Sequence, residues 1–259
     1  MGNAIKQSVS RLSVHEAISS VELYEGRLSP LTSEIGFLQC DVEAAVKAFT
    51  LWQKRMQGPR GVEVEVSRAS CESLDILLEN LLPLTSVERR RMLFVSTRGS
   101  WCAYFDNGWR GTDAYSTISY LAEMIGCRGG RMLYVPHSLD SQEGTQPGRY
   151  GAVALEIFSA QKTDFVNTER SIAVAFDGKK WAFSEAGAKQ CFEQVDQYAN
   201  RSVRSRFTEA MLEEYLMALG IDAFKEDFYD PENAFLAEKK GPMAPATKEF
   251  SLSEVQASW

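Results

Sequence analysis

A pattern that occurs twice constrains the fold of this chain more than any other feature. Residues 91–108 run from an apolar stretch through a glycine-containing turn into a second apolar stretch with a tryptophan, and end at a glycine. Residues 170–187 repeat this order loosely. Short apolar stretches joined by a glycine turn are typical of β-hairpins. The pattern therefore predicts two hairpins, with strands at 92–97 and 101–106 and at 172–176 and 181–184.

A helical pattern follows each of these hairpins. It contains Tyr120-Leu121 and ends at Gly126 after the first, and contains Tyr215-Leu216 and ends at Gly220 after the second. Two interpretations stay open. The chain contains a duplicated unit of hairpin and helix, or the residues that every hairpin needs have recurred independently.

The rest of the chain mixes helices and strands. Apolar residues at helical spacing predict helices that begin near Ser13, Asp41, Leu74 and Thr208. Valines alternate with glutamates over 62–66, as in a half-buried strand. Further strands are expected at 35–38, 132–136 and 150–158. Because the elements do not alternate regularly, the sequence predicts an α+β fold with a mainly antiparallel sheet.

The length of the chain sets its expected domain organisation. A chain of 259 residues can form one large domain or two small ones. We expect a single α+β domain over residues 12–235, within which lobes at 12–160 and 165–235 each contain one hairpin. Polar residues, glycine and proline from residue 236 onward predict a flexible tail over 236–259.

Charge and cysteine content argue against several kinds of partner. The chain has 28 Lys and Arg against 35 Asp and Glu, for a net charge of −7, whereas nucleic-acid binding needs cationic side chains. No apolar run is long enough to span a membrane, and the first residues lack the apolar core of a signal peptide. Five cysteines without a Cys-x-x-Cys pair favour reduced thiols and a cytoplasmic location. Two distant histidines do not suit a zinc site, and we expect neither metal nor cofactor.

The sequence contains none of the common catalytic signatures, such as Gly-x-Ser-x-Gly, Ser-x-x-Lys or His-Glu-x-x-His. One arrangement for nucleophilic catalysis remains, in which Cys102 and His137 meet with Asp106 or Asp140 as the orienting acid. Cys102 lies between apolar neighbours in a predicted strand, so an inert buried thiol is the favoured interpretation. We therefore predict no catalytic residues.

Two segments are typical of protein-binding surfaces. Trp109 and Arg110 lie in a loop between glycines, and tryptophan and arginine are the residues most enriched at binding hot spots. The alternative is that Trp109 folds back onto the core. Residues 209–232 carry eight carboxylates and one lysine, which suits a basic partner or, alternatively, a solvated helix face. The predicted partner-binding residues are Trp109, Arg110, Asp222, Glu226, Asp227 and Asp230.

In this general profile the chain resembles bacterial immunity proteins, the cytoplasmic inhibitors that neutralise a cognate secreted toxin. Many of these are acidic and without motifs, because inhibition needs only a surface complementary to the toxin. The resemblance implies a non-catalytic module that binds a basic toxin or effector domain. Two other classes stay open: an enzyme with a dispersed active site, such as a cysteine/histidine-dependent hydrolase or transferase, and a self-assembling structural module. The sequence does not indicate the oligomeric state.

Overall fold

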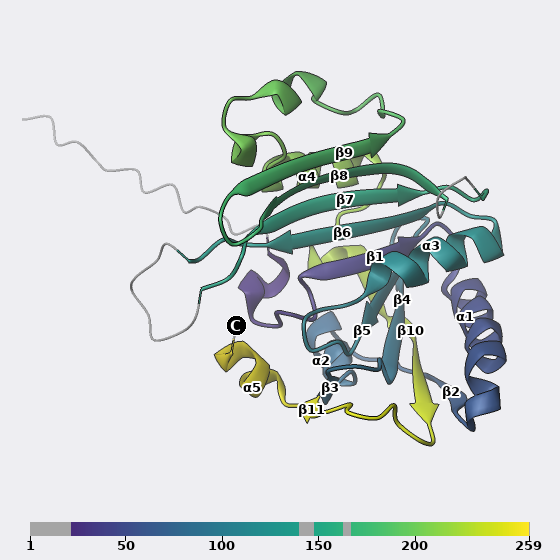
Figure 1. The fold of residues 1–259 in the computed structure, drawn as a ribbon. Coiled ribbons are helices and arrows are strands. Elements are labelled where there is room, and N and C mark those ends of the chain that lie inside the picture. The colour runs from purple at the N-terminus through teal and green to yellow at the C-terminus, as the bar shows by residue number, and fades with distance from the viewer. Residues whose placement is uncertain (1–21, 140–147, 163–166, 259) are drawn as a thin grey trace, which may run out of the picture.

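A computed structural model describes residues 22–139, 148–162 and 167–258 of the chain (Figure 1). Its main element is a nine-stranded sheet in which every neighbouring pair is antiparallel. The strands are β1 (Glu34–Leu38), β2 (Glu63–Arg68), β4 (Arg91–Thr97), β5 (Cys102–Asp106), β6 (Gly129–Val135), β7 (Ala152–Phe158), β8 (Thr168–Phe176), β9 (Trp181–Gly187) and β10 (Tyr229–Lys240). Their order is β2-β10-β4-β5-β1-β6-β7-β8-β9. The predicted α+β fold with a mainly antiparallel sheet is confirmed.

Helices cover both faces of this sheet. On one face lie α1 (Val42–Gln57) and α3 (Ala114–Ile125), and on the other lie α2 (Leu74–Glu79) and α4 (Glu209–Ala218). The central strands are therefore buried on both sides. In β4, Met92 and Phe94 face the α1 and α3 side, while Leu93 and Val95 face the α2 and α4 side. Such double burial explains why the strand is a continuous apolar run.

The two predicted hairpins are present, as β4–β5 and β8–β9. Each is followed by its predicted helix, but α3 and α4 pack on opposite faces of the sheet. Pairing of β7 with β8 joins the segments expected as two lobes into one continuous sheet. The predicted helix that begins at Ser13 lies outside the described residues, apart from a short 3-10 helix at Leu23–Gly26.

The C-terminal segment differs from the predicted flexible tail. Residues 236–240 belong to β10, which lies between β2 and β4 and pairs with both. This segment is ordered as a strand because its apolar side chains are packed in the sheet. Ala234 and Ala237 are fully buried, and Phe235 lies opposite Phe94. The sequence pattern did not predict this strand, because Pro231 and the irregular register between Asp230 and Ala234 interrupt its alternation.

Beyond β10 the chain continues along the protein surface. It forms β11 (Glu249–Phe250), which pairs with β3 (Leu84–Thr85), and then α5 (Leu252–Ala257). A capping box between Ser251 and Glu254 begins this helix. Gln256 then donates its side-chain amide to the carbonyl oxygens of Arg27 and Ser29. These bonds hold the segment against the body of the protein (Figure 1).

Candidate functional site

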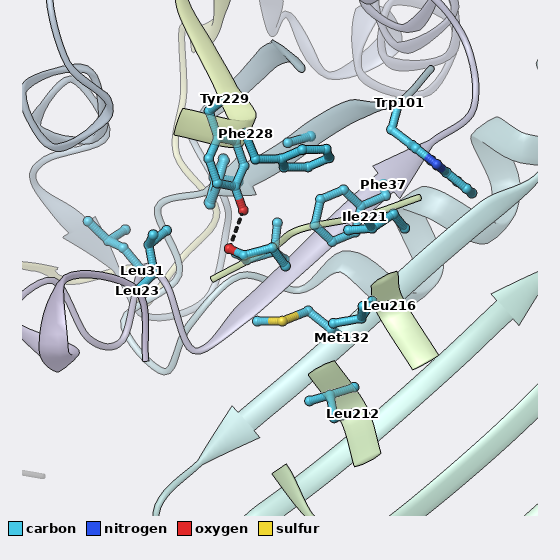
Figure 2. Close-up of a cluster of buried hydrophobic side chains, with 14 of the residues drawn as sticks. Leu23, Leu31, Phe37, Trp101, Met132, Leu212, Leu216, Ile221, Phe228 and Tyr229 are labelled. Carbon is cyan, nitrogen blue, oxygen red and sulfur yellow. Dashed lines mark hydrogen bonds between the residues drawn. The ribbon is translucent and has the colours of Figure 1, made fainter. Parts of the chain in front are cut away.

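The acidic segment, residues 209–232, is anchored by the buried face of α4. Thr208 begins the helix as predicted, because its hydroxyl accepts a hydrogen bond from the backbone N–H of Met211. The buried face consists of Met211, Leu212, Tyr215 and Leu216. Figure 2 shows Leu212 and Leu216 in the same apolar cluster as Phe37, Trp101 and Met132.

The chain after α4 is held by buried side chains and two hydrogen bonds. Trp101 donates its indole N–H to the carbonyl oxygen of Leu219 at 3.1 Å. Tyr229 donates its hydroxyl to the carbonyl oxygen of Ala223 at 2.7 Å (Figure 2). Ile221, Phe228 and Tyr229 are buried in the cluster. The backbone between residues 219 and 229 is therefore fixed at several points.

The four predicted carboxylates lie on or directly after this fixed backbone and differ in accessibility. Glu226 and Asp227 are exposed, whereas Asp222 and Asp230 are partly buried. Lys225, the one lysine of the segment, pairs with Asp222 at 3.5 Å. Burial and the neighbouring Glu226 carboxylate together raise the pKa of Tyr24 above its ordinary value. Because Glu226 and Asp227 are the exposed members of this group, they are the carboxylates most available to a partner.

The loop that carries Trp109 and Arg110, here called the Trp109 loop, directly follows β5. It therefore lies at the end of the β4–β5 hairpin away from the turn. Its tryptophan is partly buried and stacks on Phe250 of β11, with ring centroids 5.3 Å apart. Arg110 is exposed and lies over the Trp109 ring. At the turn end of the hairpin, the N–H of Arg98 donates to the carbonyl oxygen of Phe228. The structure therefore does not bring the Trp109 loop and the acidic segment together, and Trp109 packs against the protein as in the alternative interpretation.

Cys102 and His137 do not meet either. Cys102 is buried in the core beneath α1 and α3, and burial raises the pKa of its thiol well above the ordinary value. His137 follows β6, packs against the rings of Phe176 and Trp181, and accepts the N–H of Gly151 at Nδ1. Trp181 packs against the core on the other face of the sheet. Asp140 lies outside the described residues.

Asp106, the other predicted orienting acid, organises its own loop. The carboxylate is fully buried and accepts hydrogen bonds from the N–H groups of Gly108 and Asp113 and from the hydroxyl of Tyr104. Arg89 Nε lies 3.3 Å from it. Burial raises the pKa of Asp106 to about 6, although the Arg89 guanidinium opposes this shift.

Asp106 also lines a cavity of about 670 Å³ that sequence analysis did not identify. The cavity lies beside α1 and is lined on another side by residues 242–245. Its walls come from five separate parts of the chain, including β4, β5 and β10. Because no local spacing connects these parts, no motif could have indicated the cavity.

Neither a protein-family model nor a curated protein nor a solved structure matches the chain. Among the helices that the structure describes, none has the length and apolar character needed to cross a membrane. Within the same described ranges, no group of three or more His, Cys, Asp or Glu side chains could hold a metal ion.

Proposed function

We propose that the protein is a non-catalytic binding module of the cytoplasm that neutralises a bacterial toxin by direct contact, as an immunity protein does. One observation supports this proposal most. The exposed carboxylates Glu226 and Asp227 lie on a backbone that is anchored on both sides by buried residues. A basic toxin or effector domain would dock on this surface.

A fixed acidic surface has two advantages for an inhibitor. Because its backbone is held in place before binding, little conformational entropy is lost when a partner docks. Its charge accelerates the encounter with a basic partner and makes the association rate sensitive to salt. Lys225 pairs with Asp222 and so does not neutralise these two carboxylates.

Charge reversal at the two exposed carboxylates tests the surface. The tagged protein is first used at low salt to isolate its partner, and the purified pair is then studied by stopped-flow kinetics. We expect Glu226→Lys/Asp227→Lys to slow association roughly tenfold or more and to weaken its salt dependence. In cells that express the partner, the same variant should protect growth less well than the unchanged protein.

Glu63→Lys/Glu65→Lys is the matched control. It makes the same change in net charge on two exposed glutamates of β2, which pair with the C-terminal end of β10, whereas Glu226 and Asp227 precede its N-terminal end. We expect this variant to change association by about twofold or less, since only long-range charge is altered. Equal rates for all three proteins would show that the acidic segment is not the interface.

A further inference from the structure

The cavity beside α1 is lined by a buried polar atom that nothing in the described protein satisfies. Gln53 of α1 is 5% exposed, and its buried Oε1 has no hydrogen-bond donor among the described residues. The buried Nε–H of Arg89 likewise finds no acceptor with hydrogen-bond geometry, although it is ion-paired with Asp106 at 3.3 Å. A buried polar atom without a partner costs about 1–3 kcal/mol. Oε1 of Gln53 is such an atom, and a ligand in the cavity that offers a donor would satisfy it.

A third polar group of the cavity is the ammonium of Lys239. Successive side chains of a strand point to opposite faces, so Lys239 shares a face with buried Ala237, which packs in the core beneath α1. Among the described residues it forms no salt bridge within 4.0 Å, although Glu88 and Asp106 lie close enough to influence it. Burial lowers the pKa of Lys239 below its ordinary value. Within the described ranges, this cation therefore has no direct counter-ion.

Aromatic and apolar side chains form the other walls of the cavity. Phe49 and Trp52 of α1 meet edge to face with centroids 5.9 Å apart, and Tyr104 and Met92 come from the sheet. Such walls suit a flat apolar group. A planar ring can lie here while a charged substituent reaches Lys239.

The charges around the cavity limit the charge of its ligand. Three basic side chains are matched by three acidic ones, so a ligand with several negative charges would be repelled by the carboxylates. A single negative charge instead meets the ammonium of Lys239, the basic group of the lining that burial penalises and that no described carboxylate contacts within 4.0 Å. The basic residues are Arg60, Arg89 and Lys239, and the acidic residues are Glu88, Asp106 and Asp113.

We propose that this cavity binds a small aromatic carboxylate that carries an amino or hydroxyl donor. The carboxylate lies on Lys239 and Arg89, the ring lies along Trp52 and Tyr104, and the donor reaches Oε1 of Gln53. This site lies apart from the acidic segment and does not depend on the proposed toxin neutralisation.

Titration of the full-length protein with 4-aminobenzoate tests the site, because this molecule has all three features in their smallest form. We expect a Kd on the order of 1 mM or tighter. Benzoate is the matched ligand, since it lacks only the donor, and it should bind several times more weakly. Calorimetry or ligand-observed NMR measures both affinities.

Three variants assign the contacts. Lys239→Met should weaken 4-aminobenzoate binding tenfold or more, whereas Lys240→Met should leave it unchanged, because Lys240 is exposed and pairs with Glu238. Gln53→Leu should bind both ligands equally, because only 4-aminobenzoate offers a donor to the lost oxygen. If Gln53→Leu does not fold, Gln53→Met replaces it.

The proposal is overturned if neither ligand binds the unchanged protein, or if Lys239→Met binds as tightly as Lys240→Met. Thermal unfolding of each variant separates loss of binding from loss of fold. The variant Glu226→Lys/Asp227→Lys should bind 4-aminobenzoate normally, so failure of the toxin-binding proposal would leave this result unaffected.

Discussion

The two hairpins begin from similar sequences and end in different surroundings. β4–β5 lies inside the sheet between β10 and β1, and every residue of β5 is buried. β8–β9 forms one edge of the sheet, and most residues of β9 are exposed. The comparison teaches that the local pattern determines the hairpin, whereas distant segments determine how deeply it is buried.

Corresponding residues of the two segments illustrate this difference. Counted from the first arginine of each, Arg91 corresponds to Arg170 and Asp106 to Glu185. The Arg91 side chain is 32% exposed and pairs with Glu238 of β10. The Arg170 side chain is only 1% exposed and pairs with Glu185 and with the fully buried side chain of Glu193. Of the two corresponding arginines, the one in the edge hairpin is therefore the more deeply buried.

The largest contrast is expected when each arginine is replaced by methionine. Arg170→Met leaves Glu193 buried without its cation, which should lower the free energy of unfolding by about 3–5 kcal/mol. Arg91→Met removes a partly exposed pair and should cost about 1 kcal/mol or less. Urea unfolding of the two variants measures both values. Similar losses for the two would mean that the ion pairs contribute alike despite their different burial.

A somewhat smaller contrast is expected from loss of one aromatic ring in each hairpin. Phe94→Ala in β4 should cost about 3 kcal/mol, because the side chain is fully buried beside Phe49 and Tyr104. Phe183→Ala in β9 should cost about 1 kcal/mol, because that ring is only partly buried against Tyr198. Thermal or urea unfolding gives the difference. A larger loss for Phe183 would show that the edge hairpin is the more stabilising of the two.

The smallest contrast concerns pH, where Asp106 and Glu185 should act in opposite directions. Burial raises the pKa of Asp106 from 3.8 to about 6, so its contribution to stability falls as the pH rises from 4 to 7, by roughly 2 kcal/mol. Arg170 lowers the pKa of Glu185. The stabilisation from Glu185 is therefore present above its ordinary pKa of 4.5 and is lost as the pH falls below that value.

Urea unfolding between pH 3 and pH 7 separates these two effects. Asp106→Asn should reduce the decline between pH 4 and pH 7, while Glu185→Gln should reduce the loss of stability in acid. Unchanged pH profiles for both variants would mean that other groups dominate the titration of the folded protein.

Local patterns predicted most of the fold correctly. The hairpins, α1, α3 and the Thr208 cap follow from residues close together in sequence, where periodicity and capping act. β10 was missed because its partners are distant in sequence and Pro231 interrupts its pattern. The capping box at Ser251 and Glu254 was visible in the sequence, but the polar residues before it suggested disorder.

The candidate site divides in the same way. Exposure of Glu226 and Asp227 agrees with their place in an acidic stretch, since such residues are seldom buried. Sequence spacing could not show that Trp109 stacks on Phe250 or that Gln53, Arg89 and Lys239 share a cavity. These contacts depend on how the sheet brings remote segments together.

The position of β10 also has a consequence for how the protein is made. Arg68 in β2 pairs with Phe235 in β10, and β10 is the strand that joins β2 to the rest of the sheet. During synthesis on the ribosome, β2 and the edge of β4 that pairs with β10 therefore stay without their partner strand until residues 229–240 have been made. Pairing over such distances is slow, and open strand edges attract other chains. A nascent chain that stalls before residue 229 would leave two edges without β10, one on β2 and one on β4.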